Sequence, residues 1–210
     1  MSTGTPAPQP ASTARLEAFS DGIFAIAATL LVLDLRVPDD VTTGGLAHAL
    51  GQLWPNYAAY VVSFATIGII WMNHHAQVDR IARADRGLLT LNLVLLLFVS
   101  VIPFPTSMLA RFLRAGSDQH VAAAVYSATL LGMGVAFFAM FTYARRAGLI
   151  VDQVSPAAAR FLTIRNLAGL VPYAIAVGLA FVSAPASLAL CGAVALYYLL
   201  PERLLGLPDA

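Results

Sequence analysis

The chain has 210 residues, of which 59% are hydrophobic and only 11% are charged, and its mean hydropathy is +0.78. A soluble domain carries about 25% charged residues, and a disordered chain is poor in apolar ones, so both classes are excluded. A formal net charge of +1 creates no basic surface for a polyanion, which excludes nucleic acid as a partner. The composition predicts an integral membrane protein without a soluble catalytic domain.

The first expected element is a solvated tail over residues 1–14, which contain three prolines and no charged side chain. A membrane domain is then expected over 15–205. Each crossing needs about 20 mostly apolar residues, so six crossings nearly fill the chain. The first helix is expected over about 15–36, with Asp21 near one end and Asp34 near the other.

Segments without Asp, Glu, Lys, Arg or His mark the later helices. One such segment covers the 25 residues between His48 and His74, and others cover 87–110 and 121–144. The charge-free segment 166–201 has 36 residues, which is too long for one crossing and predicts two helices joined by a tight turn. The six helices are expected at about 15–36, 52–76, 86–110, 119–145, 157–183 and 185–203.

The predicted fold class is all-α, because these segments are continuously apolar whereas the strands of a membrane barrel alternate. Pro103 and Pro105 are expected to kink or end the third helix.

Arginine predicts the orientation, because all 12 basic residues are Arg. With a cytoplasmic N terminus, nine of them lie on the cytoplasmic side and three on the other side. Cytoplasmic loops of membrane proteins are enriched in basic residues, so we expect a multi-pass protein with both termini in the cytoplasm. The all-arginine, alanine-rich composition points to a GC-rich bacterial genome, and the expected location is therefore a bacterial inner membrane.

The first helix also shows an apolar stripe. At 100° per residue, Gly22, Leu30 and Leu33 fall within about 40° of Ile26, and Thr29 at about 60°. Plain core packing is one interpretation of such a stripe, and a functional surface is the other.

Asp21 falls about 140° from Ile26 and therefore faces a different neighbour. An ionisable group inside a crossing costs about 3 kcal/mol, so it needs a partner. Asn73, His74 and His75 are expected at the same level of the membrane. Asp21 is then either a structural anchor or a site for protons or ions. Adjacent histidines point to different sides of a helix, so no metal site is expected there.

Two segments resemble a known family, namely the endosomal and lysosomal transmembrane potassium channel and its prokaryotic homologues. They are Arg15-x-x-x-Phe19-Ser20-Asp21 and Trp71-Met72-Asn73-His74-His75. The resemblance implies one six-helix repeat per chain and a homotetramer in which four first helices surround a central pore. It further implies that no cofactor is needed and that potassium is the permeant ion.

The resemblance also implies roles for individual residues. Ile26, Leu30 and Leu33 would form the apolar rings of a gate, and Thr29 together with Ile26 would contribute to selectivity. A structural polar network would hold the first helix in place, and its expected members are Arg15, Phe19, Ser20, Asp21, Asn73, His74 and His75. Helical phase partly disagrees, because it places Arg15 about 20° from the Ile26 stripe.

Two functions remain as hypotheses. The first is a potassium-selective or weakly selective cation channel, whose partners are further copies of the chain, membrane lipid and potassium ions. The second is a proton- or ion-coupled secondary transporter that uses Asp21 and His74 or His75. An enzyme is not expected, because the chain has no GxxxxGK[ST] loop and no GxSxG elbow.

Overall fold

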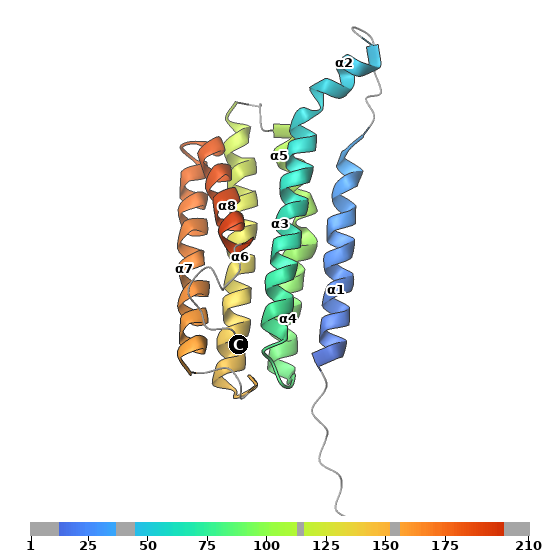
Figure 1. Cartoon of the computed structure of the whole chain (residues 1–210). Helices are drawn as coiled ribbons and strands as arrows, with labels where there is room; N and C mark the ends of the chain where they lie inside the picture. Colours follow the sequence, from blue (N-terminus) through green and yellow to red (C-terminus); the bar gives the residue numbers. More distant parts are fainter. Residues whose placement is uncertain (1–12, 37–44, 113–115, 152–155, 200–210) are drawn as a thin grey trace, which may run out of the picture.

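The computed structural model describes residues 13–36, 45–112, 116–151 and 156–199. Within these ranges the chain is almost entirely helical (Figure 1). The elements are α1 (Thr13–Leu30), η1 (Leu31–Asp34, a 3-10 turn), α2 (Gly45–Gln52), α3 (Trp54–Val78), α4 (Arg86–Val101), α5 (Pro103–Phe112), α6 (Asp118–Arg146), α7 (Pro156–Ala180) and α8 (Ala184–Leu199). Most of the expected tail, 1–14, and the end of the expected domain lie outside the described residues.

The long helices stand side by side and alternate in direction along the chain (Figure 1). α1 packs against α3 and α4 at one side of the bundle, whereas α7 and α8 pack against α6 at the other. α6 also contacts α4 and α5, so it joins the two halves. The start of α1, the α3–α4 turn and the α6–α7 turn all lie at one end of the bundle (Figure 1).

Several of these helices are long and apolar enough to cross a membrane. Four qualify among the described residues, namely Thr13–Asp34, Arg86–Phe112, Asp118–Arg146 and Arg160–Ala180. α2 and α3 make a fifth if this pair, bent by 48°, is one span. α8 is apolar but has only 16 residues, and the end of the expected helix 185–203 lies outside the described residues. Six crossings therefore stay a prediction.

The third expected helix is broken at its prolines. α4 ends at Val101 and α5 begins at Pro103, after which helical structure continues to Phe112. Pro103 has no N–H to donate to the preceding turn, and this explains the break. Pro105, inside α5, does not end the helix, so the pair interrupts the span without terminating it.

A small clamp joins the α3–α4 turn to the α6–α7 turn. Ile81 and Ile150 form an antiparallel bridge, and the Ala82 amide donates to the Leu149 carbonyl at 2.8 Å. Beside this bridge, Asp85 caps α4 by accepting from the Leu88 amide at 2.8 Å, and it also accepts from the Tyr143 hydroxyl at 2.8 Å. The bond from the Leu88 amide lowers the pKa of Asp85 below its ordinary value.

The clamp yields a test of packing at Gly87. A Cβ at this position would collide with the Tyr143 hydroxyl and displace it from its hydrogen bond with Asp85. We expect Gly87→Ala to lower the free energy of unfolding by about 1–3 kcal/mol, as overpacking commonly does. The measurement is the thermal midpoint of the purified protein in detergent. The matched control is Gly178→Ala, whose added Cβ meets nothing within 4 Å. Equal midpoints for the two variants would contradict the expected collision.

Candidate functional site

α1 has one face buried in the chain and one face left uncovered by it. The buried face repeats at helical spacing and consists of Leu16, Ser20, Phe24, Ala27 and Leu31. It packs against α3 and α4. The opposite face is apolar and exposed, and it consists of Phe19, Ile26, Leu30 and Leu33. We call this exposed set the α1 stripe; it contains the three residues that were expected to form a gate.

The end of α1 changes its winding within the stripe. The helix is α-helical only to Leu30, and Leu31–Asp34 form a 3-10 turn. Side chains three residues apart lie on the same face of a 3-10 turn, so Leu33 stays on the same face as Leu30. Ile26 and Leu33 are 59% and 64% exposed, which is unusual for large apolar side chains unless lipid or another copy of the chain covers them.

Thr29 lies beside the α1 stripe and is exposed. Its hydroxyl is within 3.0 Å of the Ala25 carbonyl and 2.9 Å of the Ile26 carbonyl, so its proton is directed at the helix backbone. A hydroxyl that donates backwards keeps its oxygen lone pairs for another partner. Thr29 therefore presents an oxygen acceptor on an otherwise apolar surface.

A buried chain of hydrogen bonds ties α1 to α3 and α4. The Asn92 amide nitrogen donates to the Ser20 hydroxyl at 3.0 Å, and His74 Nε2 lies 2.9 Å from the Asn92 amide oxygen. That oxygen can only accept, so the His74 proton is on Nε2. Ser20 in turn donates to the Leu16 carbonyl at 2.8 Å. All three polar side chains are buried, so water does not compete for the hydrogen bonds that connect α1 to α3 and α4 here.

Two further contacts join α1 to α3 closer to the surface. Glu17 Oε1 lies 2.7 Å from His75 Nδ1, and Trp71 Nε1 donates to Asp21 Oδ1 at 2.8 Å. Asp21 was expected to bond Asn73, His74 or His75, and the structure pairs it with Trp71 of the same helix. Trp71 and His75 are one helical turn apart, so they meet two α1 residues with the same separation.

The other predicted network members, Asn73, Arg15 and Phe19, take part in none of these contacts between α1 and its neighbours. Asn73 is about 200° from Trp71 around α3 and faces the opposite side. Its amide oxygen accepts from Arg165 at 3.1 Å, and its nitrogen reaches the Tyr198 carbonyl at 3.2 Å. Arg15 and Phe19 are exposed. The structure thus separates the seven predicted network residues into distinct locations.

Three residues that bond α1 to α3 and α4 were not predicted from the sequence, namely Glu17, Trp71 and Asn92. Asn92 is a side-chain amide within the apolar segment 87–110, and a polar residue in such a segment is a signal that a partner exists. Its actual partner Ser20 is 72 positions away, and no local pattern indicates that pairing.

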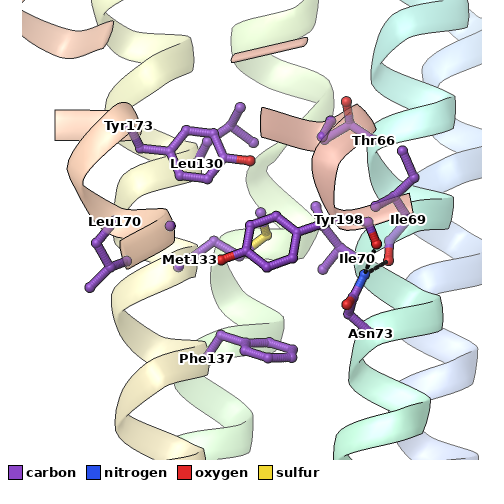
Figure 2. Close-up of a pocket in the computed structure, with 13 residues that line it drawn as sticks. Thr66, Ile69, Ile70, Asn73, Leu130, Met133, Phe137, Leu170, Tyr173 and Tyr198 are labelled. Atoms are coloured by element: carbon purple, nitrogen blue, oxygen red, sulfur yellow. Dashed lines mark hydrogen bonds between the residues drawn. The ribbon is translucent and has the colours of Figure 1, made fainter. Parts of the chain in front are cut away.

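A cavity of about 70 Å³ lies on the other side of α3, between α6, α7 and α8 (Figure 2). Its walls are mostly apolar, with Met133 and Ile70 among the lining side chains. Asn73 bonds to the Tyr198 carbonyl at its edge, as Figure 2 shows. The cavity is remote from the α1 stripe, since α3 separates them.

Comparisons with known proteins find related potassium channels over most of the chain, including α1, α3 and α4. The family model described as the endosomal/lysosomal potassium channel TMEM175 matches residues 15–103. A potassium channel of Streptomyces collinus is 54% identical over 185 residues, covering 88% of this chain and 90% of that protein. A potassium channel of Chamaesiphon minutus is 38% identical over 197 residues, covering 92% of this chain and 97% of that protein. The crystal structure of a lysosomal potassium-selective channel TMEM175 homolog from Chamaesiphon minutus superposes with a TM-score of 0.80 at 37% identity, over 89% of this chain and 95% of that one.

Proposed function

Because the chain belongs to the family of the endosomal/lysosomal potassium channel TMEM175, we propose that it conducts potassium through a pore lined by the α1 stripe. The chain is a prokaryotic member of this family and an all-helical membrane protein. Its relatives are named as channels, which supports the channel hypothesis over the coupled transporter and over any enzyme.

The observation that carries the pore proposal is the exposed face of α1. In the proposed homotetramer, four copies of α1 surround an axis and turn Ile26, Leu30 and Leu33 towards it. Each residue then forms a ring of four apolar side chains. A narrow apolar constriction empties of water, and an ion cannot keep its hydration there, so the rings act as a gate. Widening the rings would let water and potassium pass.

Thr29 and Ile26 are the proposed selectivity residues. The Thr29 hydroxyl donates its proton to the helix backbone, so four such oxygens would face the axis as acceptors. A ring of oxygen atoms can replace part of an ion's hydration shell, and this costs less for potassium than for the more strongly hydrated sodium.

The buried chain of Ser20, Asn92 and His74 is proposed to hold α1 at a defined distance from the axis. Asp21 and Trp71 support it closer to the surface, together with Glu17 and His75. No cofactor is required, because conduction needs only a pore and an ion gradient.

The proposed placement is a bacterial inner membrane with both termini in the cytoplasm. The turn between α3 and α4 and the end of α6 carry Arg80, Arg83, Arg145 and Arg146, and they lie at the same end of the bundle as the start of α1 (Figure 1). Basic residues concentrate on the cytoplasmic side, which supports this orientation.

The test is a planar-bilayer recording of the purified full chain with potassium on one side and sodium on the other. We expect discrete current steps and a reversal potential displaced towards potassium. Thr29→Val removes the oxygen at nearly constant volume and is expected to move the reversal potential towards zero. Thr90→Val, at an exposed threonine of α4 that bonds its own helix, is the matched control.

Two outcomes would contradict the proposal. Silent bilayers from protein that native mass spectrometry shows to be a tetramer would oppose a pore. Saturating flux coupled to a second ion, without unitary steps, would favour the transporter instead. An unchanged reversal potential in Thr29→Val would remove Thr29 from the selectivity assignment.

A further inference from the structure

A cluster of three ionisable side chains joins the first turns of α1 to the last turns of α3. Its members are Glu17 from α1 and His75 and Asp79 from α3. One ligand atom from each residue lies within 4.8 Å of the other two. All three side chains are partly exposed to solvent, so an ion from solution can reach them.

The contacts within this cluster define the state of the imidazole. Glu17 Oε1 lies 2.7 Å from His75 Nδ1, and an ionised carboxylate can only accept, so the proton is on Nδ1. In neutral His75 the lone pair is then on Nε2. Nε2 lies 3.6 Å from Asp79 Oδ2, which is too far for a hydrogen bond.

That separation matches two ligands of one metal ion. With metal–ligand bonds of about 2.05 Å and a tetrahedral angle, two ligand atoms lie about 3.3 Å apart. His75 Nε2 and Asp79 Oδ2 are close to this distance at 3.6 Å, and both residues project from one face of α3 because they are four positions apart. Little movement of either side chain is needed.

We propose that His75 Nε2 and Asp79 Oδ2 bind a zinc-type divalent cation, with water completing its coordination. Glu17 is a positioning residue: it accepts from Nδ1–H and fixes the tautomer and the orientation of the ring. A carboxylate bonded to the far nitrogen of a ligating histidine is a recurrent arrangement in zinc sites. Because Glu17 belongs to α1, the bound ion would strengthen the connection between α1 and α3.

The adjacent histidines His74 and His75 point to different sides of α3 and do not share an ion. His74 is occupied in the buried chain with Asn92, and it takes no part here. The structure instead combines His75 with an acid one turn later and with a second acid from another helix. The alternative is a protonated His75 held between two carboxylates, and metal binding distinguishes the two.

The test is calorimetric titration of Zn²⁺ into the purified full chain in detergent at neutral pH. We expect one ion per chain. His75→Ala should abolish this binding, and Asp79→Asn should weaken it at least about tenfold, because each removes a ligand. Glu17→Gln should weaken it about 10- to 100-fold without changing the stoichiometry, as loss of a carboxylate behind a ligating histidine does. His48→Ala, at an exposed histidine of α2, is the matched control and should leave binding unchanged.

A second readout uses Trp71, whose ring stacks on His75 with centroids 6.0 Å apart. In Trp54→Phe protein Trp71 is the only tryptophan, since the chain has two. Co²⁺ bound at His75 should quench its fluorescence, and Zn²⁺ should reverse the quenching.

Three results would overturn the proposal. These are equal Zn²⁺ binding by the wild type and His75→Ala, loss of binding in His48→Ala, and no quenching in Trp54→Phe protein. Unchanged affinity in Glu17→Gln would overturn the positioning role. Asp79→Asn alters an exposed side chain, so it keeps the test valid if His75→Ala does not fold. None of these readouts depends on ion conduction.

Discussion

Replacing Ile26 with alanine is expected to increase the potassium current through the channel. The change removes three carbons from each of four side chains in the proposed constriction, so the pore becomes wider and retains water more easily. Lowering the barrier for ion passage by about 1.4 kcal/mol would raise the current about tenfold. The measurement is single-channel recording in symmetrical potassium, which separates conductance from open probability.

Ile175→Ala provides the matched control for this experiment. Ile175 is an isoleucine of α7 that is as exposed as Ile26, at 55% against 59%, and it lies in the half of the bundle away from α1. The current through the Ile175→Ala variant should equal that of the wild type. Leu30→Ala and Leu33→Ala should also increase the current if the gate consists of several rings. Unchanged conductance in all three α1 variants would mean that the α1 stripe contacts lipid and does not line the pore.

Replacing Asn92 with leucine is expected to have the largest effect on stability among polar substitutions near α1. The change leaves His74 Nε2–H buried without an acceptor and removes the donor to the Ser20 hydroxyl, which keeps its own bond to the Leu16 carbonyl. A buried unsatisfied group costs about 1–3 kcal/mol in soluble proteins, and interhelical hydrogen bonds in membranes contribute somewhat less. We expect the free energy of unfolding to fall by about 2 kcal/mol, which lowers the thermal midpoint by about 4–8 °C for a chain of this size.

Asn56→Leu is the matched control for Asn92→Leu. Asn56 is half-buried, and its amide donates to the Asp34 carbonyl at a longer distance of 3.4 Å. Its replacement should therefore lower the free energy of unfolding much less. The measurement is thermal unfolding of the detergent-solubilised protein, followed by bilayer recording of the protein that stays folded. Equal midpoints for the two variants would refute the proposed importance of the Ser20–Asn92–His74 chain.

The membrane class, the all-helical fold and the family could all be predicted from the sequence, and the comparisons confirm them. The channel interpretation is also confirmed over the transporter. These predictions succeed because they depend on composition and on short motifs. A continuously apolar segment can satisfy its backbone polar groups in a membrane only as a helix, whatever its neighbours are.

Helical phase also located the α1 stripe, because the direction of a side chain around one helix depends only on residue number. Phase would equally have separated Asn73 from Trp71 and His75, since these residues lie on one helix. The 3-10 turn over Leu31–Asp34 has no such signal, yet it leaves Leu33 on the face of Leu30, so the predicted stripe is preserved.

The pairing between helices was decided only by the tertiary structure. Asp21 bonds Trp71, and His74 bonds an asparagine of α4 rather than Asp21. Which side chains meet depends on how far one helix is rotated and shifted against its neighbour, and that is set by the packing of all the apolar side chains between them. The sequence by itself thus determined what kind of protein this is and which face of α1 is apolar. Only the packed bundle decided which polar groups hold α1 in place, because such contacts depend on helices far apart in the chain.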